Sequence, residues 1–287
     1  MNFKFGFLVC VAGALMTSGC VEVEGEIQSG QLGLPGTNTA AAGSGVTTPG
    51  IPTYPGSPSS PGTPTTPVIA PPRATGTIYT HNERYLYTYD LATNTETLVG
   101  RFSPPGGGMM GNMSDIAVSN NGTLIGISCF GVIYQINPVN AEITLLMQYP
   151  GGGNALTFLA NGTLMAAGGR RITTVDLARQ TITPLSQDQS FESSGDIAAL
   201  PDGLLYETVL DGASDALVKI DPSNGHTLRI GSIGFKDVGG LAYVGGRLYG
   251  FNLSGSIILI DPATGRGTAI GSSSLDHFGA ASNSQAW

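Results

Sequence analysis

From residue 76 onward, short segments that alternate large apolar with polar residues are separated by turns rich in Gly, Asn and Asp. Residues 84–89 (RYLYTY) alternate in this way, as a half-buried β-strand does. One unit shows four successive segments of this kind, at residues 114–119, 123–128, 132–136 and 142–146. No segment repeats apolar residues with the period of an amphipathic helix. The pattern therefore predicts an all-β domain at residues 76–287.

Two kinds of turn recur along this domain and reveal a repeat. One kind follows a strand and begins with Asp or Asn, at spacings of 47, 39, 45 and 40 residues: Asp90, Asn137, Asp176, Asp221 and Asp261. The other is a two-residue hairpin turn of the kind that tolerates positive φ angles: Asn121-Gly122, Asn161-Gly162, Asp202-Gly203 and Gly245-Gly246. A period of about 40–45 residues with four strands per unit is typical of β-propeller blades. With strands named A to D from the axis outward, these are the C–D and A–B turns.

The two ends of the domain predict how the propeller closes. There are five C–D turns but four A–B turns. Residues 76–103 supply strands B, C and D without a strand A, and residues 276–283 supply a single strand A. Pairing these two segments removes two exposed sheet edges. We therefore expect a β-propeller of five four-stranded blades, closed by the C-terminal strand pairing into the first blade.

The second blade carries a motif that resembles a known group of propellers. Residues 115–124 (DIAVSNNGTL) are similar to the repeats of the NHL and SMP-30/gluconolactonase proteins. The resemblance extends over most of residues 76–287 and implies a propeller fold. That group includes metal-dependent lactonases and many interaction modules. The metal ligands of the lactonases have no residue-by-residue match here, and their six blades exceed five, so the resemblance implies the fold without the lactonase activity.

The first 19 residues have the organisation of a signal peptide. Lys4 supplies a positive charge, and residues 5–16 form an apolar stretch that is too short to span a bilayer. The run LMTSGC at residues 15–20 resembles the lipobox of bacterial lipoproteins. This resemblance implies that Cys20 is lipidated, becomes the mature N-terminus and attaches the protein to a membrane.

Two details of this motif bear on the destination of the protein. Thr17 stands where the lipobox usually has Leu, and the alternative is an ordinary signal peptidase that releases a secreted, unanchored protein. Val21 follows the cysteine in place of the Asp that retains lipoproteins of enteric-type bacteria in the inner membrane. We therefore expect an exported protein that is lipid-anchored in the outer membrane, on its periplasmic side or at the cell surface.

Residues 20–75 are predicted to be the lipidated cysteine and a disordered stalk rich in Pro, Gly, Ser and Thr. Between residues 49 and 67 a proline stands at every third position. Polyproline II has three residues per turn, so these prolines line one edge of a stiff, extended rod. The segment cannot bury enough apolar surface to fold. It is predicted to set the reach of the domain and to supply no chemistry.

Composition narrows the classes of function. Charged residues make up 11% of the chain, the formal net charge is −8, and the 12 Lys and Arg residues are scattered. Nucleic-acid binding requires basic patches, so no nucleic acid is expected as a partner. Of the three cysteines, Cys10 lies in the signal segment and Cys20 would carry lipid. Cys129 then has no partner cysteine and is interpreted as a small, partly buried hydrophobic residue.

The loops indicate where a ligand would bind. The A–B and C–D turns are uniformly short and share one face of the propeller, whereas the B–C and D–A loops lie on the opposite face and differ between blades. Binding residues concentrate on variable loops held by a rigid scaffold. The candidate binding residues of this loop face are His81, Glu83, Arg84, Arg170, Arg171, Asp211, Asp215 and His277. The two histidines could also build a zinc or acid–base site, although a solvated or hydrogen-bonding role is the simpler interpretation.

An oxygen-bearing residue stands near the start of every strand A, at spacings of 39, 42, 41 and 39 residues: Asp115, Asn154, Asp196, Asp237 and Asp276. Around a five-fold axis these side chains would form a ring at the mouth of the channel. Crowded carboxylates must protonate, bind water or hold a cation, and oxygen ligands favour Ca²⁺. The alternative is that each Asp accepts hydrogen bonds from the backbone of its own loop.

These observations favour a lipid-anchored cell-envelope β-propeller that acts as a binding module for a protein or a glycan. The alternative is a hydrolase of lactonase or glycosidase type that uses Asp115, Asp196 and Asp276 at the channel mouth. Two carboxylates ~5–10 Å apart across an open pocket would favour glycoside chemistry. A filled channel or a flat face would favour binding. A purely structural envelope protein is a third hypothesis.

Overall fold

The computed structural model describes residues 7–9, 21–23, 77–105, 111–185 and 190–283. Two short strands, β1 (Phe7–Val9) and β2 (Val21–Val23), pair antiparallel with each other. Cys20 and the proline repeat lie outside the described residues, so lipidation and the stalk stay predictions. In the part of the chain that the structure describes, no helix is long and apolar enough to cross a membrane.

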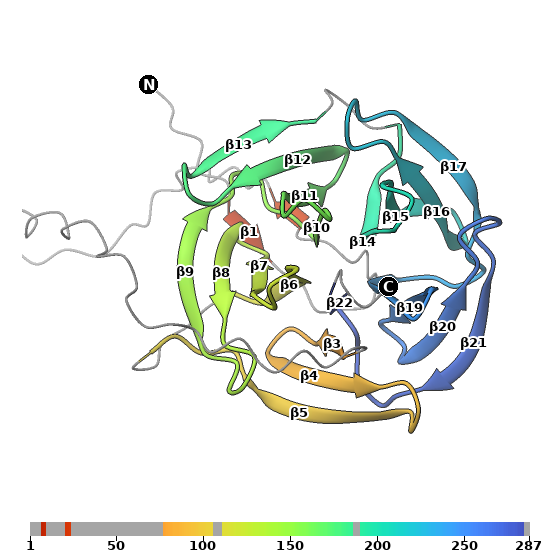
Figure 1. Ribbon diagram of the computed structural model, residues 1–287, viewed down its shortest axis with the longest axis horizontal. Coiled ribbons are helices and arrows are strands. Elements are labelled where there is room, and N and C mark those ends of the chain that lie inside the picture. The colour runs from red at the N-terminus through yellow and green to blue at the C-terminus, as the bar shows by residue number, and fades with distance from the viewer. Residues whose placement is uncertain (1–6, 10–20, 24–76, 106–110, 186–189, 284–287) are drawn as a thin grey trace, which may run out of the picture. The chain divides into compact units, whose positions relative to one another are not determined.

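In the described residues from 77 onward, twenty strands form five antiparallel sheets of four strands each, arranged as a β-propeller (Figure 1). From the axis outward, blade 1 consists of β22 (Gly279–Ser282), β3 (Ile78–His81), β4 (Tyr85–Asp90) and β5 (Thr95–Arg101). Blade 2 consists of β6 (Met113–Val118), β7 (Leu124–Ser128), β8 (Val132–Ile136) and β9 (Ile143–Gln148). Blade 3 consists of β10 (Ala155–Phe158), β11 (Leu164–Gly168), β12 (Arg171–Asp176) and β13 (Thr181–Pro184). Blade 4 consists of β14 (Ser193–Ala199), β15 (Leu205–Asp211), β16 (Ser214–Ile220) and β17 (Thr227–Ser232). Blade 5 consists of β18 (Val238–Val244), β19 (Arg247–Asn252), β20 (Ser256–Ile260) and β21 (Gly267–Ser272). The predicted fold class and the number of blades are confirmed.

The ring is closed by strands from the two ends of the domain. β22 pairs antiparallel with β3, from Gly279 opposite His81 to Ser282 opposite Ile78. The innermost strand of blade 1 therefore comes from the C-terminal end of the domain, and its three outer strands come from the start (Figure 1). This confirms the predicted closure, which pairs backbone groups that two free sheet edges would leave exposed.

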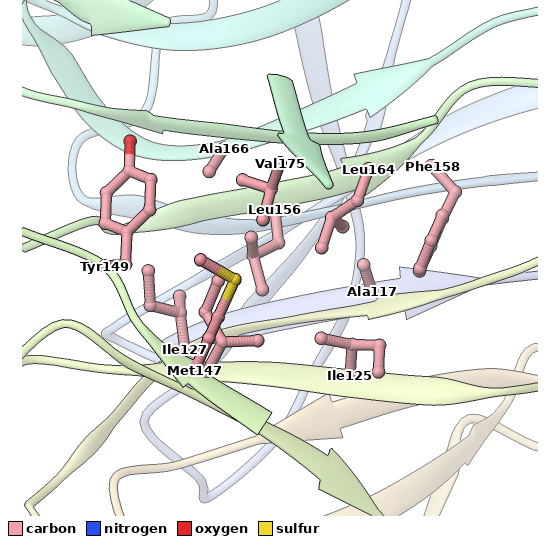
Figure 2. Close-up of a cluster of buried hydrophobic side chains, with 11 residues drawn as sticks. Ala117, Ile125, Ile127, Met147, Tyr149, Leu156, Phe158, Leu164, Ala166 and Val175 are labelled. Carbon is pink, nitrogen blue, oxygen red and sulfur yellow. The ribbon is translucent and has the colours of Figure 1, made fainter. Parts of the chain in front are cut away.

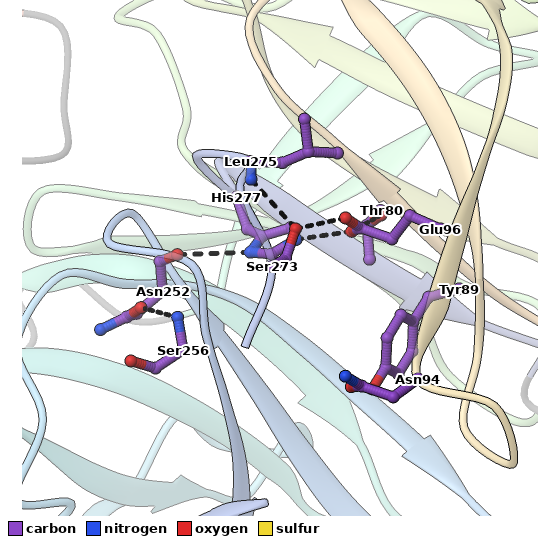
Figure 3. A network of polar contacts seen from close by, with 9 residues as sticks. All are labelled: Thr80, Tyr89, Asn94, Glu96, Asn252, Ser256, Ser273, Leu275 and His277. Carbon is purple, nitrogen blue, oxygen red and sulfur yellow. Dashed lines mark hydrogen bonds and ion pairs between the residues drawn. The ribbon is translucent and has the colours of Figure 1, made fainter. Parts of the chain in front are cut away.

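A polar network, the closing clasp, ties the segment before β22 to blade 1 (Figure 3). Nε2 of His277 lies 2.6 Å from Oε1 of Glu96, and the hydroxyl groups of Ser273 and Thr80 donate to the same carboxylate. Nδ1 of His277 faces the backbone oxygen of Asn252 at 3.3 Å, so both ring nitrogens face acceptors. Burial alone would raise the pKa of Glu96, but the hydrogen bonds from His277 and Ser273 outweigh burial and lower it. The carboxylate is therefore held in its charged form inside the joint.

Apolar side chains pack between adjacent blades, so the domain has a ring of cores. Figure 2 shows the cluster between blades 2 and 3, where Met147 and Tyr149 lie among aliphatic side chains of both blades. Similar clusters lie between the other neighbouring pairs of blades. The innermost strands contribute small side chains such as Ala117 and Ala242, because the blades converge at the axis. Each sheet is covered only by its neighbours, so the ring must be complete for every blade to be buried.

Candidate functional site

Two carboxyl groups are enclosed at the propeller axis. Asp115 lies on β6 and Asp196 on β14, and both residues are 0% exposed. Oδ2 of Asp115 accepts a hydrogen bond from the backbone nitrogen of Leu156 in blade 3 at 2.5 Å. Oδ2 of Asp196 accepts one from the backbone nitrogen of Leu241 in blade 5 at 2.5 Å. An innermost strand has one edge without a partner strand, so its N–H groups need such acceptors. Each carboxyl group thereby joins two neighbouring blades.

The same two groups, called here the axial carboxyl pair, also interact with each other. Burial, and after it the nearby Asp196 carboxylate, raises the pKa of Asp115 well above its usual range. Burial likewise raises the pKa of Asp196 well above its usual range, although hydrogen bonds from Asp115 and from backbone N–H groups oppose the rise. Adjacent carboxylates in a medium of low dielectric constant cannot both ionise. The pair therefore favours a state in which one of the two groups is protonated.

A buried histidine, His81 on β3, borders this pair. Its Nδ1 lies 2.9 Å from the backbone oxygen of Asn82, and burial lowers the pKa of His81 to about 4. Within the described parts of the chain, Nε2 of His81 and Oδ1 of Asp115 have no hydrogen-bond partner, and both lie against Gly279. A Cβ atom at residue 279 would stand 2.3 Å from Nε2 and 2.2 Å from Oδ1. Residue 279 must therefore be glycine, because any larger residue would displace the imidazole of His81 or the carboxyl group of Asp115.

The axis itself is nearly filled. A cavity of ≈ 20 Å³ lies among the innermost strands of all five blades, lined by side chains such as Ala117, Thr157 and Ala281. That volume holds about one water molecule. Neither Asp115 nor Asp196 lines this cavity. Their direct interaction leaves no room for a sugar ring between the two carboxyl groups.

The structure brings together two of the five residues predicted to form an oxygen ring. Asp115 and Asp196 each stand seven residues before the glycine of their own A–B turn. In the other three blades, the equivalent positions hold residues without polar side chains: Ala155, Gly240 and Gly279. The remaining predicted members stand one to three residues earlier and are half-buried or exposed: Asn154, Asp237 and Asp276. Among the described residues, no group of three or more His, Cys, Asp or Glu side chains could hold a metal ion. Calcium binding therefore stays a prediction, and of the five predicted ligands only the side chains of Asp115 and Asp196 meet at the axis.

The loop face is built from D–A connections that lie between the B–C loops of two blades. In the connection into blade 2, the backbone nitrogen of Met113 donates to the oxygen of Glu83 in blade 1 at 3.0 Å. The backbone nitrogen of Cys129 in blade 2 donates to the oxygen of Asn112 in that connection at 2.9 Å. The connection into blade 4 makes the same kind of contacts with blades 3 and 4. These hydrogen bonds join the loops of neighbouring blades into one continuous surface.

Four of the predicted binding residues are exposed on this face: Arg84, Arg170, Arg171 and Asp211. Glu83 is half-buried beside them. Three apolar side chains that the sequence analysis did not single out are also exposed in or beside the B–C loops: Tyr85 (36%), Phe130 (52%) and Leu210 (36%). Arginine and aromatic side chains are enriched where binding energy concentrates in protein interfaces. The loop face therefore carries the side chains that a binding surface uses.

The other three predicted binding residues lie in the interior, because they stand at strand ends and point between blades: His81, Asp215 and His277. His81 borders the axial carboxyl pair, and His277 belongs to the closing clasp. Oδ2 of Asp215 accepts a hydrogen bond from the backbone nitrogen of Val238 at 2.8 Å, which ties the start of blade 5 to blade 4. These three side chains hold the loops in place, and a ligand on the surface cannot reach them.

Comparison with known proteins shows the fold and no family. No family model matches the chain, and no curated protein matches it. A chain from the crystal structure of a nidogen/laminin complex matches with a TM-score of 0.52 and 12% identity, over 71% of this chain and 97% of that chain. TolB from Acinetobacter baumannii matches with a TM-score of 0.47 and 17% identity, over 70% of this chain and 54% of TolB. At such identities the likeness shows a β-propeller alone, and membership of the NHL or SMP-30 group stays a prediction.

Proposed function

We propose that this protein is a lipid-anchored module of the cell envelope that binds a protein or a glycan with its loop face. One observation carries the proposal: exposed Arg84, Arg171 and Phe130 share the loop face, while the cavity at the axis has room for about one water molecule. A chain of similar fold comes from a complex of two proteins, nidogen and laminin, and this accords with protein binding. The lipobox at Cys20 and the proline-rich stalk would hold the domain at a distance from the outer membrane, where it can meet a partner.

The hydrolase alternative receives no support from the axis. Asp115 and Asp196 are in direct interaction inside the protein, whereas glycoside chemistry needs two carboxylates with a sugar between them. Asp276, the third carboxylate of that hypothesis, is exposed on the loop face. The buried pair is explained by the backbone N–H groups that it satisfies.

Capture from an envelope extract tests the loop face directly. The exported chain carrying Cys20→Ser is immobilised without lipid, incubated with the extract and, in parallel, applied to a glycan array. A loop-face variant, Arg84→Glu with Arg171→Glu, is compared with Arg247→Glu, which reverses one charge in the A–B turn region of blade 5. We expect the loop-face variant to lose its captured component and Arg247→Glu to retain it. Equal capture by both variants would contradict the proposal.

The anchor is tested separately by fractionation. Three acyl chains exceed the two signals usually needed for stable attachment, so the wild-type protein should stay with the membrane after a salt wash. The Cys20→Ser variant should move to the soluble fraction. A variant that stays in the membrane with unchanged mobility on a gel would show that Cys20 does not carry the anchor.

A further inference from the structure

Charge is unevenly divided over the loop face. In the described B–C loops of blades 1 to 3, three exposed cationic side chains, Arg84, Arg170 and Arg171, outnumber one half-buried anionic side chain, Glu83. The loops around blades 4 and 5 carry mostly anionic side chains: Glu192, Asp211, Asp237 and Asp276. Asp211 pairs with Arg229, whose Nη2 lies 2.5 Å from its Oδ2, and Lys236 is a further cation on that side. The two halves of one face therefore attract ligands of opposite charge.

The cationic half is a continuous strip of loops. The connection at residues 111–113 lies between the loop of Arg84 and the loop of Phe130, through the backbone hydrogen bonds described above. The next connection lies against Phe130's loop, since the backbone nitrogen of Tyr149 donates to the oxygen of Gly131 at 2.5 Å. Arg171 of blade 3 donates to Gly151 of the same connection. We call Arg84, Arg170, Arg171, Tyr85 and Phe130 the arginine strip.

The strip is partly pre-organised. Nη2 of Arg171 donates to the backbone oxygen of Gly151 at 3.0 Å, which fixes the guanidinium against the connection between blades 2 and 3. Gly151 has φ +87°, and a Cβ atom there would stand 2.3 Å from Nη2 of Arg171. A side chain held before binding loses less conformational entropy when a ligand arrives. Arg171 keeps further N–H groups for a carboxylate, since guanidinium has five donors.

We propose that the arginine strip is the part of the loop face that makes contact with the partner, and that it binds an acidic polypeptide segment containing aromatic residues. This inference rests on the proposed function and names its partner class. Guanidinium groups bind carboxylates through paired hydrogen bonds, and exposed Phe130 and Tyr85 offer apolar and ring contacts between them. The chain carries a net charge of −8, so an acidic partner is repelled by most of the surface and is oriented toward this strip.

A defined probe is a random copolymer of glutamate and tyrosine, with a copolymer of lysine and tyrosine as the charge-reversed control. Binding of fluorescent copolymer to the exported Cys20→Ser chain is measured by anisotropy at low and at physiological salt. We expect binding of the glutamate copolymer that weakens with salt, because exposed charge pairs are screened. Arg84→Glu with Arg171→Glu should weaken it by at least about tenfold, and Phe130→Ala by a smaller factor. Arg247→Glu with Arg266→Glu, outside the loop face, should leave it unchanged.

Four results would overturn the inference. The first is preference for the lysine copolymer, and the second is glutamate-copolymer binding that survives charge reversal of the strip. The third is tighter binding of an anionic polysaccharide, such as alginate, because it would assign the strip to a glycan. The fourth comes from envelope capture: if Glu192→Arg with Asp211→Arg abolishes capture and the strip variant does not, the loop face binds through its acidic half. In that case the proposed function stands and this inference fails, whereas capture that neither variant changes would overturn both.

Discussion

The axis and the loop face of this propeller carry the same kinds of residue and use them in opposite ways. At the axis, Asp115, Asp196 and His81 are 0% exposed. The two carboxyl groups accept hydrogen bonds from the backbone of neighbouring strands, and His81 faces the backbone oxygen of Asn82. On the loop face, Asp276 and Arg84 are exposed. Both regions lie at the ends of strands A and B, only a few residues apart in the sequence. The difference shows that burial, and not residue type, decides which of these side chains support the structure and which stay accessible at the surface.

Deleting the closing strand β22 is expected to destabilise the domain more than any of the substitutions that follow. A chain that ends at Leu275 lacks β22 and His277, so blade 1 loses its innermost strand and the closing clasp loses its imidazole. We expect the truncated domain to fail to unfold cooperatively, because the axis can no longer close. Thermal unfolding followed by circular dichroism checks this. A truncated chain that keeps the melting temperature of the full chain would refute the closure as the basis of stability.

Replacing an axial carboxyl group is expected to lower the free energy of unfolding by less than the deletion of β22 does. Replacing a loop-face carboxylate should leave the free energy of unfolding almost unchanged. Asp196→Ala leaves the N–H groups of Ile197 and Leu241 without their acceptors, at about 1–3 kcal/mol each. Asp276→Ala is the matched control on the loop face, and should change the free energy of unfolding by less than about 0.5 kcal/mol. Denaturant unfolding measures both. Equal costs for the two variants would remove the distinction between the regions.

The closing clasp should contribute about as much to the free energy of unfolding as the hydrogen bonds of Asp196 do. Glu96→Ala removes the carboxylate that faces His277 at 2.6 Å in a site that is nearly closed to water. Loss of one partner from a buried pair costs about 3 kcal/mol or more. Glu96→Gln keeps the shape of the side chain and separates the loss of charge from the loss of packing. If Glu96→Ala leaves stability unchanged in denaturant unfolding, the network in Figure 3 is not a clasp.

Stability should depend on pH through the buried groups. Burial raises the pKa of Glu207 to about 8 from 4.5, so its contribution is fully present below about pH 4.5 and is lost as pH rises through 8. The axial carboxyl pair acts in the same direction. His81 acts in the opposite direction, because its pKa is lowered from 6.5 to about 4 and the folded state resists protonation as pH falls through that range. We expect the melting temperature to rise as pH falls from about 8 to about 6.5, to change little between about 6.5 and 4.5, where Glu207 and His81 oppose each other, and to fall below about pH 4.5.

The Glu207→Gln variant tests which part of this pH dependence of the melting temperature comes from Glu207. The variant has no carboxyl group to ionise, so the alkaline decline should flatten, and the decline below about pH 6.5 that depends on His81 should become steeper because Glu207 no longer offsets it. An unchanged alkaline decline would show that other groups cause it.

Calcium should have the smallest effect. Oδ2 of each axial carboxyl group already accepts a hydrogen bond from a backbone N–H group, and the other three ring residues do not reach the pair. Millimolar Ca²⁺ should therefore leave the melting temperature unchanged. A clear rise that Asp196→Asn abolishes would restore the predicted metal ring.

The sequence predicted the five blades and their closure because both depend on local signals. Turn residues such as Asn121-Gly122 and Asp202-Gly203 mark each A–B hairpin, and the unmatched segments at the two ends of the domain leave one way to complete the ring. These signals do not require knowledge of how one blade sits against the next.

The site was predicted less completely because it depends on register and burial. Near-constant spacing suggested that Asp237 and Asp276 align with Asp115, but the D–A connections differ in length, and both residues stand three positions too early. The exposure of Phe130 and the burial of His277 depend on contacts between blades, and alternation along one strand does not encode them.

Photo-crosslinking from two positions of one blade tests the central claim most directly. A photoreactive phenylalanine analogue replaces Phe130 in the B–C loop of blade 2 or Val139 in its C–D turn, where the natural side chains are 52% and 75% exposed. The full chain is irradiated in cells that export it, and covalent adducts are detected on a gel. We predict a discrete adduct from position 130 and none from position 139. An adduct from position 139 alone, or from neither position, would contradict a binding role for the loop face.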